Sequence, residues 1–426
     1  MRKAANIHKP KGSVFAALDV GSSKVACFIA RMLDDEGHYE VLGVGHLESR
    51  GIKSGIATDQ GEIEQVIRKA VDIAENMAAK AMKGYPLRDV VMTVSGNVAT
   101  SHNFQVDVAI AGQEIVENDI KRSLVKAQEQ LLDQTEDELV HTIPAGYRID
   151  GNDGIREPRG MYGERLGVDV HLVTGNTASL RNLAVPVQRS HLDIDSLCLS
   201  SYAAGLASLV EDEMDLGCTV IDMGGGTTSF AVFQGGVMLY GGAVPLGGKH
   251  ITNDIARGLT TSLIDAERLK TLYGSAIGTT VDQNEMIDVT QIGEAGQREI
   301  NHVPRSLLIG IIQPRVEEIL ELVRAKLKES GFGDLAGRRV VLTGGASQLP
   351  HIRDLAQIVL DKQVRLGGPL SVQGLPDSVS SSAFAATVGL IHFAATRSHE
   401  IPADIIMQAD NDNLLDRVKI WLRENW

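Results

Sequence analysis

The feature that most constrains this chain is a repeated segment in which an apolar strand ends at an aspartate and a glycine follows two positions later. The first copy contains Asp19 and Gly21, and the second contains Asp222 and Gly224. In each copy a second apolar run follows the turn, which is the pattern of a β-hairpin. The aspartates lie 222 − 19 = 203 positions apart, nearly half of the 426-residue chain. This repeat predicts a duplicated α/β domain whose two copies face each other.

Helical patterns fit the same plan. Apolar side chains recur at helical spacing in residues 61–83, 118–132, 263–273 and 314–329. Asp59 and Gly84 are suited to cap the first of these helices, and Pro314 is suited to open the last, because proline is tolerated in a first helical turn. Two further segments, after Leu199 and after Ser382, are rich in small residues. We expect a helix at each place, with backbones that cross closely.

The turns carry the candidate chemistry. A glycine-rich turn leaves consecutive backbone N–H groups unobstructed, so it can wrap the oxygens of a polyphosphate, and the aspartate before it would face a metal ion. A single copy could also be an ordinary tight turn whose aspartate bonds to the backbone. Two copies and a third glycine-rich turn, Thr343–Ser347, together favour nucleotide binding. The chain has neither G-x-x-x-x-G-K-[ST] nor a G-x-G-x-x-G that opens a helix after a strand.

These turns resemble the phosphate, connecting and adenosine motifs of the ATPase superfamily that contains actin, sugar kinases and heat-shock chaperones. Within it, the chain is similar to the FtsA family of bacterial cell-division proteins, from Val14 to Phe393 and again in the last dozen residues. The runs that carry this resemblance are S-R-G-I at Ser49–Ile52, VIDMGGGTTSFAVF, GGKHITNDIA followed by DAERLK, PRSL, and VVLTGGASQLP. The resemblance implies an α/β fold of duplicated actin-like (RNase H-like) ATPase domains, with one actin subdomain absent and an α+β subdomain inserted elsewhere.

The implied division of the chain has six parts. We expect a first actin-like domain (14–86, 167–198 and 375–396), an inserted subdomain (87–166), a second actin-like domain (199–230 and 310–374), its smaller subdomain (231–309), a flexible linker (397–412) and a C-terminal amphipathic helix (413–426). The linker prediction rests on a polar, acidic composition without any period.

The resemblance also implies site residues, position by position. Phosphates would be held from one side by Gly21, Ser22, Ser23 and Lys24, and from the other by Gly224, Gly225, Gly226, Thr227 and Thr228. Mg²⁺ would be held through water by Asp19 and Asp222. The adenosine of ATP would lie on Gly344, Gly345 and Ala346 and be reached by Glu267 and Lys270. Glu267 and Lys270 could equally form a surface ion pair, and Lys24 could be a solvated strand lysine.

Hydrolysis of ATP is a separate question. It needs a side chain that orients water in line with the γ-phosphate, and no motif in this chain identifies one. The resemblance implies ATP binding with at most weak ATPase activity, so we assign no catalytic residue. We expect the nucleotide to act mainly as a clamp that fixes the angle between the two halves, and hence the polymer-forming surfaces.

Composition excludes several other classes of function. No stretch approaches the ~20 apolar residues of a membrane-spanning helix. A net charge of −14 would repel a phosphate backbone and argues against a general nucleic-acid binder. The three cysteines, Cys27, Cys198 and Cys218, indicate neither a disulfide framework nor a zinc site. We therefore expect a cytosolic chain, and the apolar run behind its basic start is too short for a signal peptide.

The last fourteen residues have their own pattern. Projected on a helix, they place one apolar face along Leu414, Leu415, Val418, Trp421, Leu422 and Trp426. Such a helix could dock on the protein's own core. Tryptophan prefers an interface where its ring is apolar and its N–H is wet, so a helix lying in the plane of a membrane surface fits better. The FtsA family also ends in an amphipathic membrane-targeting helix.

The resulting hypothesis is an ATP-binding actin homologue that polymerises on the cytoplasmic face of the inner membrane at the division septum. It would anchor filaments of the tubulin-like protein FtsZ (the Z ring) and recruit later divisome membrane proteins. The FtsZ C-terminal tail would dock on the smaller subdomain of the second half, with Arg305 as a contact, and the inserted subdomain would serve filament contacts. The alternatives are a pilus-assembly homologue of the PilM type and a sugar-kinase-like phosphotransferase, neither of which needs the terminal helix. A chaperone is disfavoured because no substrate-binding β domain follows residue 396.

Overall fold

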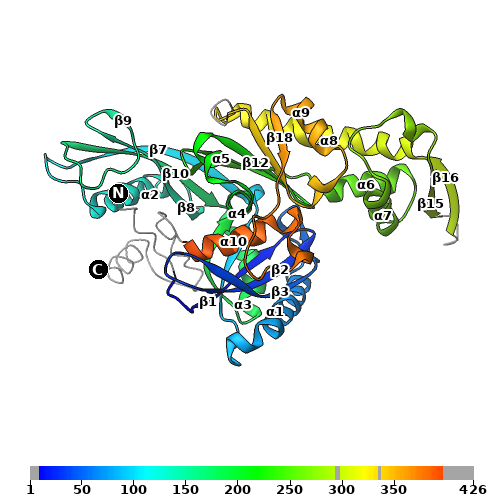
Figure 1. Ribbon diagram of the computed structural model, residues 1–426, viewed down its shortest axis with the longest axis horizontal. Coiled ribbons are helices and arrows are strands. Elements are labelled where there is room, and N and C mark those ends of the chain that lie inside the picture. Colours follow the sequence, from blue (N-terminus) through cyan, green and yellow to red (C-terminus); the bar gives the residue numbers. More distant parts are fainter. Residues whose placement is uncertain (1–8, 293–297, 334–336, 397–426) are drawn as a thin grey trace.

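Figure 1 shows the chain as a computed structural model, which describes residues 9–292, 298–333 and 337–396. The predicted linker and amphipathic helix, residues 397–426, lie outside the described residues. The described part is elongated. Two halves with a large sheet each lie at its centre, the inserted subdomain projects at one end, and the smaller subdomain of the second half projects at the other.

The first half is built on a five-stranded sheet with the order β11-β6-β1-β2-β3. Its strands are β1 (Val14–Val20), β2 (Lys24–Met32), β3 (Tyr39–Glu48), β6 (Asp89–Val94) and β11 (Asp193–Leu199). The pairs β1–β2 and β2–β3 are antiparallel, whereas β1–β6 and β6–β11 are parallel. Helices α1 (Gln60–Met82) and α3 (Thr177–Arg189) lie on its outer side, and α10 (Ala385–Thr396) lies on the side toward the second half (Figure 1).

The second half repeats this arrangement. Its sheet has the order β18-β17-β12-β13-β14, formed by β12 (Cys218–Met223), β13 (Thr228–Gln234), β14 (Val237–Val244), β17 (Arg339–Thr343) and β18 (Gln363–Leu366). The order and the strand directions match those of the first sheet place for place. The sheet packs against α4 (Ser200–Ser208), α5 (Glu211–Leu216), α8 (Arg305–Glu329) and α9 (Ile352–Leu360). The predicted duplication of the α/β fold is therefore confirmed.

The two halves meet where α4 crosses α10. A Cβ added to Gly389 of α10 would overlap the backbone carbonyl of Ala203 in α4, and one added to Gly205 would overlap the ring of Phe233. Both helices are rich in alanine and glycine and are almost fully buried. Small residues therefore permit the close crossing that the sequence predicts.

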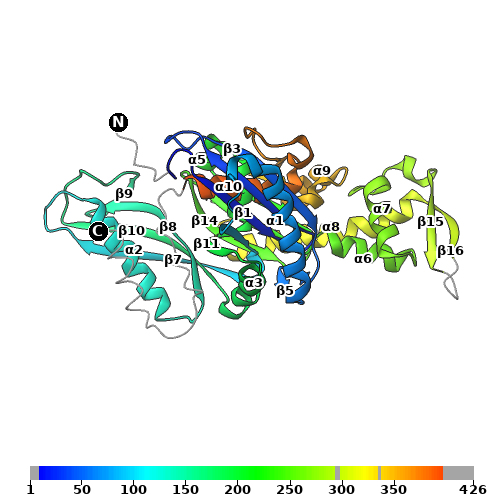
Figure 2. The same ribbon diagram turned by 90° about the horizontal axis from the view of Figure 1, so that it is seen from below.

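The inserted subdomain has a core of its own. Its sheet has the order β7-β10-β8-β9, and its elements are β7 (Ala99–Ala109), β8 (Glu138–Ile149), β9 (Asn152–Ile155), β10 (Arg165–Gly175) and α2 (Glu117–Leu132). Helix α2 covers one face of this sheet, and a separate apolar cluster lies between them. Figure 2 shows this unit projecting beyond the central sheets.

The predicted limits of the inserted subdomain, residues 87–166, need correction. Strand β6 hydrogen-bonds to β1 and β11 and so belongs to the first sheet, whereas β10 lies between β7 and β8. The unit therefore runs from about residue 99 to 175. From the sequence, each apolar run near these limits could have joined either sheet, because an apolar run predicts a buried strand but does not indicate which strand it pairs with.

The inserted subdomain also rests on the second half. The hydroxyl of Ser101 donates to the carbonyl of Gly241 in β14 (2.8 Å) and accepts from the N–H of the same residue (3.0 Å). His171 Nδ1 donates to the carbonyl of Met238, also in β14 (3.1 Å). Burial lowers the pKa of His171 to about 3, so its ring is neutral at physiological pH. Strand β14, at the edge of the second sheet, thus contacts the inserted subdomain, although the inserted subdomain follows a strand of the first sheet in the sequence.

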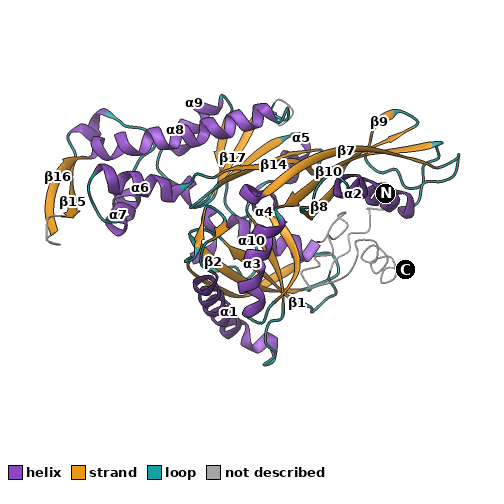
Figure 3. Ribbon diagram, turned by 180° about the vertical axis from the view of Figure 1, so that it is seen from behind, coloured by secondary structure: helices purple, strands orange, loops and turns teal. Residues whose placement is uncertain are grey.

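The smaller subdomain of the second half consists of helices and one hairpin. It contains α6 (Gly248–Gly258), α7 (Leu263–Tyr273), β15 (Met286–Ile292), β16 (Arg298–Pro304) and the first part of α8. The predicted helices 61–83, 118–132 and 263–273 all form, and Asp59 caps α1 by accepting from the N–H of Glu62 (3.0 Å). Figure 3 shows α8 running from this subdomain to the second sheet.

The predicted start of the last helix at Pro314 is wrong. Helix α8 begins at Arg305, and Pro314 lies inside it. Proline cannot donate to the carbonyl four residues earlier, which belongs to Gly310. Gly310 is exposed, and nothing lies near the position of its missing side chain. Water can therefore reach that carbonyl, and the helix continues through the proline. No helix in the described parts of the chain is long and apolar enough to cross a membrane.

Candidate functional site

The two predicted phosphate turns have the same backbone geometry. In the first, Val20 pairs with Val25 and the N–H of Gly21 donates to the carbonyl of Lys24 (3.0 Å). In the second, Met223 pairs with Thr228, and the N–H of Gly224 donates to the carbonyl of Thr227 (2.9 Å). Each hairpin therefore closes on a four-residue turn with the same hydrogen bond across it.

The fold brings these turns into contact. A Cβ added to Gly225 would lie 2.6 Å from the Cβ of Ser23, and one added to Gly226 would lie 2.6 Å from the Cβ of Ser22. Real Cβ atoms do not approach this closely, so only glycine fits at both positions of the second turn. Residues about 200 positions apart in the sequence thus form one surface.

Both turns present unused backbone donors. Among the described residues, no acceptor lies within hydrogen-bonding range of the N–H groups of Ser22, Ser23, Gly225 and Gly226. Ser22 and Gly226 are buried and Gly225 is half-buried, whereas Ser23 is exposed. Buried N–H groups normally have a partner, and successive free N–H groups in a turn form an anion-binding nest. The pair of turns is therefore chemically suited to the oxygens of a phosphate chain.

The aspartate of the first hairpin is held by the protein. One carboxylate oxygen of Asp19 accepts from the hydroxyl of Thr93 (2.8 Å), and the other accepts from the hydroxyl of Thr387 in α10 (2.9 Å). Asp19 is buried. Its carboxylate therefore ties β1 to β6 and α10, in addition to any role toward a metal ion.

The aspartate of the second hairpin is different. No hydrogen-bond donor among the described residues reaches the carboxylate of Asp222. Desolvation, and to a lesser degree the charge of Asp19, raises the pKa of Asp222 to about 6, against the opposing effect of Lys24. A desolvated carboxylate without donors beside free N–H groups fits a hydrated Mg²⁺, which would supply the missing donors and positive charge. Asp222 fits this role better than Asp19.

The third glycine-rich turn lies beside the second hairpin. Gly344 has a positive φ of 87°, and a Cβ there would overlap the carboxylate of Asp222. The Cβ of Ala346 lies 3.3 Å from where a Cβ on Gly248 would be. The structure therefore brings the predicted adenosine turn, Asp222 and the start of α6 together. Gly345 lies in the same turn.

Glu267 and Lys270 do form an ion pair, with Nζ to Oε2 at 2.7 Å. The pair is not a free surface pair, because Lys270 Nζ also donates to the hydroxyl of Thr252 (2.8 Å) and to the carbonyl of Gly248 (3.2 Å). It thus lies against the start of α6, next to Ala346. Their predicted contacts with ribose and base stay predictions.

Two predicted phosphate residues have other partners. Thr228 is buried, and its hydroxyl donates to the carbonyl of Leu246 (2.9 Å), so its side chain is turned away from the turns. Lys24 Nζ donates to the carbonyl of Ala383 and lies 4.9 Å from the centre of the Phe384 ring. Lys24 is therefore not a solvated lysine, and it is close enough to Asp222 to affect its pKa.

Sequence reasoning missed two neighbours of the turns. The tip between β4 (Ile52–Lys53) and β5 (Ile56–Ala57) touches them, because the N–H of Gly55 donates to the hydroxyl of Ser22 (2.9 Å). Lys249 Nζ donates to the carbonyl of Ser22 (2.7 Å). Gly55 lies three residues after the run S-R-G-I, and Lys249 lies within the run GGKHITNDIA. Both runs carry the family resemblance, and this position in the sequence was the available signal.

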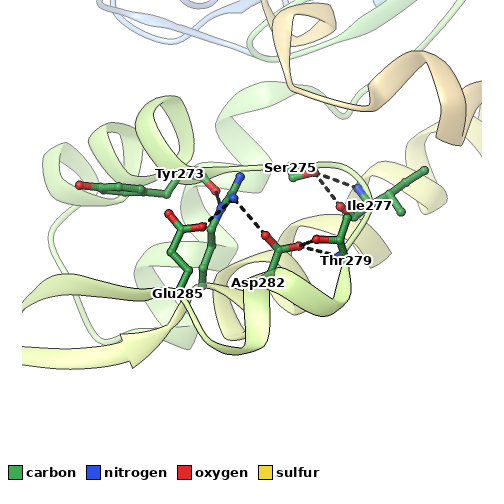
Figure 4. A network of polar contacts seen from close by, with 7 residues as sticks. Tyr273, Ser275, Ile277, Thr279, Asp282 and Glu285 are labelled. Carbon is green, nitrogen blue, oxygen red and sulfur yellow. Dashed lines mark hydrogen bonds and ion pairs between the residues drawn. The ribbon is translucent and has the colours of Figure 1, made fainter.

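Arg305, the predicted partner contact, is bonded within its own subdomain. Its Nε donates to the carbonyl of Tyr273 (2.8 Å), and its Nη1 contacts Glu285 (2.9 Å) and Asp282 (3.0 Å) (Figure 4). Asp282 is buried and also accepts from the hydroxyl of Thr279 (2.8 Å). Arg305 thus connects the start of α8 to the segment before β15, and its contact with a partner stays a prediction.

Two family models match the chain. "Cell division protein FtsA" matches residues 219–389, and "SHS2 domain inserted in FTSA" matches residues 96–174. The second match agrees with the corrected limits of the inserted subdomain. "Cell division protein FtsA" of Rhizobium meliloti is 40% identical over 98% of this chain and 96% of its own length. The protein of the same description from Escherichia coli K12 is 32% identical over 96% and 97%.

The chain belongs to the FtsA family.

Solved structures support the fold of this FtsA family member. The chain in a "PilM-PilN type IV pilus biogenesis complex" matches with a TM-score of 0.62 at 17% identity, over 89% of this chain and 98% of that one. MreB5 of Spiroplasma citri bound to ADP matches with a TM-score of 0.54 at 12% identity, over 90% and 97%. At these identities the likeness establishes an actin-like fold only. The family membership does not favour the PilM-type and sugar-kinase alternatives.

Proposed function

We propose that this protein binds Mg²⁺-ATP between its two hairpin turns. The observation that carries this proposal is the set of four backbone N–H groups without acceptors, next to the desolvated carboxylate of Asp222. Further support comes from neighbours of the same fold, described as MreB5 bound to ADP and MreB 5 bound to AMPPNP. Phosphate oxygens would accept from the turns, and Asp222 would hold the ion through water, with Asp19 behind it. The ion would neutralise phosphate charge and orient the phosphate chain.

The test of nucleotide binding is Gly225→Val. A Cβ added to Gly225 would lie 2.6 Å from the Cβ of Ser23, so a branched side chain would force the two turns apart and disturb the pair of turns that phosphate needs. We expect ATP affinity to fall at least a hundredfold while the circular dichroism spectrum stays unchanged. The matched control is Gly310→Val on the exposed side of α8, where nothing lies near the added Cβ and φ is not positive. A folded Gly225→Val variant with wild-type affinity would overturn the nucleotide site.

We further propose the cellular role of an FtsA protein. The chain would polymerise on the cytoplasmic face of the inner membrane at the septum, anchor the Z ring through the FtsZ C-terminal tail, and recruit later divisome membrane proteins. Support comes from family membership over nearly the whole chain and from the apolar face of residues 413–426. Bound nucleotide would act as a clamp on the angle between the halves, with at most weak ATPase activity.

Membrane attachment is tested by sedimentation with liposomes. Trp421→Glu places a charge in the apolar face of the predicted C-terminal helix and should release most of the protein. Lys419→Gln on the polar side should release little. If Lys419→Gln released as much protein as Trp421→Glu, the attachment would be electrostatic and the insertion proposal wrong. Electron microscopy of ATP-loaded protein on lipid monolayers should show filaments, and isolated subunits at saturating density would contradict polymerisation.

The FtsZ contact is tested with a peptide of the FtsZ C-terminal tail. Arg305→Gln should weaken binding of the peptide, whereas Arg122→Gln on the inserted subdomain should not. Because Arg305 bonds to Tyr273 and Glu285, unfolding of both proteins must be measured. Unchanged peptide affinity in a folded Arg305→Gln variant would remove Arg305 from the interface.

A further inference from the structure

Helix α6 of the second half orients the second phosphate turn. The N–H of Gly248 donates to the carbonyl of Gly224 (2.9 Å), and the N–H of Lys249 donates to the carbonyl of Gly225 (2.7 Å). The first N–H groups of the helix, which carry its positive partial charge, are thus bonded to carbonyls of the turn. The carbonyls point to α6, and the free N–H groups of the turn remain available to a ligand.

The side chain of Lys249 crosses from the second half to the first. Its ammonium donates to the backbone carbonyl of Ser22, 227 positions away, at 2.7 Å. Among the described residues, no carboxylate lies within ion-pair distance of this ammonium, whereas Lys270 on the neighbouring helix is paired with Glu267. Lys249 is exposed. A full positive charge therefore lies on the first phosphate turn with only a carbonyl dipole as partner.

Position along the site indicates which part of a nucleotide this charge would meet. Gly248 lies beside Ala346 and Lys270, the residues predicted for adenosine. The ammonium of Lys249, the next residue, bonds instead to Ser22 of the first turn, whose hydroxyl accepts from the N–H of Gly55. The ammonium is therefore bonded to a phosphate turn and to none of the residues predicted for adenosine, so it would meet the phosphate chain of a nucleotide.

We propose that Lys249 binds the terminal phosphate of ATP and makes the site selective for triphosphate over diphosphate. This inference rests on the proposed nucleotide site. On binding, the ammonium exchanges the carbonyl of Ser22 for an oxygen of the negatively charged terminal phosphate, which is the stronger acceptor. Because Lys249 belongs to α6 and the terminal phosphate would also contact the first turn, the third phosphate would replace the direct contact between Lys249 and Ser22 with a bridge between the two halves.

The test compares ATP and ADP affinities of the full-length protein by isothermal titration calorimetry with Mg²⁺. Lys249→Gln should weaken ATP binding about tenfold and change ADP binding less than twofold. Lys249→Arg, which keeps the charge, should recover most of the ATP affinity. Lys69→Gln, an exposed residue of α1 with the same change of charge, is the matched control and should leave both affinities unchanged.

The possible results separate this inference from the proposed function. If the wild-type protein bound neither nucleotide, the nucleotide site itself would be wrong, and the inference with it. If the wild-type protein bound both nucleotides but Lys249→Gln lowered the two affinities equally, Lys249 would only shape the turn. Unchanged ATP affinity in Lys249→Gln would also overturn the inference, while the nucleotide site would stand.

Discussion

The hairpins of the two halves have the same turn length and the same hydrogen bond across the turn, yet their aspartates have different surroundings. In the first half, Thr93 on the neighbouring parallel strand donates to Asp19. In the second half the equivalent residue is Thr343, which pairs with Asp222 across the sheet, but its hydroxyl is directed to the carbonyl of Ser382 (3.4 Å). The same backbone with a different hydroxyl direction gives one satisfied carboxylate and one desolvated carboxylate without donors. The repeated motif thus determines the backbone geometry of each hairpin, whereas the neighbouring side chains determine whether its aspartate is hydrogen-bonded.

The helix crossing between the halves should give the largest effect. Gly389→Ala places a Cβ against the backbone of Ala203, which cannot yield, whereas Gly205→Ala meets the ring of Phe233, which can turn. We expect Gly389→Ala to lower the free energy of unfolding by about 3 kcal/mol and Gly205→Ala by roughly half as much. Urea unfolding measures both. Equal costs would mean that the contacts of the two helices are equally rigid.

Replacing each aspartate by asparagine should change stability in opposite directions. The raised pKa of Asp222 means that its ionised form is disfavoured in the fold, a cost present above about pH 6 and absent below the pKa of the unfolded chain. Asp222 is half-buried, so solvent screens part of this cost. Asp222→Asn should therefore stabilise the nucleotide-free protein at pH 7.5 by about 1 to 2 kcal/mol. Asp19→Asn weakens bonds to Thr93 and Thr387 and should destabilise by about 1 to 2 kcal/mol. The same sign for both changes would remove the distinction between the hairpins.

The pH dependence of Mg²⁺-nucleotide binding should follow Asp222. Protons compete with the ion for this carboxylate, so affinity should fall about tenfold between pH 7 and pH 5, as a pKa of about 6 requires. Asp222→Asn should abolish the dependence. Asp19→Asn should move its midpoint to lower pH, because the charge of Asp19 raises the pKa of Asp222. A midpoint that moves upward would contradict the assignment.

The smallest change in stability is expected at the first glycine of each turn, where the two hairpins have the same geometry. A Cβ added to Gly21 lies 3.0 Å from the carbonyl oxygen of Lys24, and one added to Gly224 lies 3.0 Å from that of Thr227. Gly21→Ala and Gly224→Ala should each lower the unfolding free energy by about 0.5 to 1 kcal/mol, and by the same amount within error. Thermal unfolding of the two variants tests this equivalence. A clear difference between the two unfolding free energies would show that the two turns are not equivalent in strain despite their shared geometry.

The sequence was sufficient for the outline of the fold. The repeat around Asp19 and Asp222 predicted the duplication because strand, turn and aspartate are local features with a short-range physical cause. The cap at Asp59 is local in the same sense, and it forms. The small residues near Ala203 and Gly389 predicted a close crossing because only backbone atoms can approach so nearly.

Other features required the tertiary structure. Strand β6 could have joined either of two sheets, and only its hydrogen bonds to β1 placed it in the first. The sequence predicted a helix start at Pro314 because a proline inside a helix is costly. The structure shows that Pro314 is tolerated inside α8, because Gly310 is exposed and water can reach its unpaired carbonyl.

The candidate site likewise has features that the sequence predicts and features that require the tertiary structure. The sequence by itself determined which residues form the glycine-rich turns, because turn chemistry depends on neighbours in the chain. Only the tertiary structure decided that Thr387 and Thr93 satisfy Asp19, that Asp222 has no donor, and that Lys249 reaches Ser22. These contacts join residues up to 368 positions apart. Burial and long-range charge set the pKa of a carboxylate, and both exist only once the two halves are packed together.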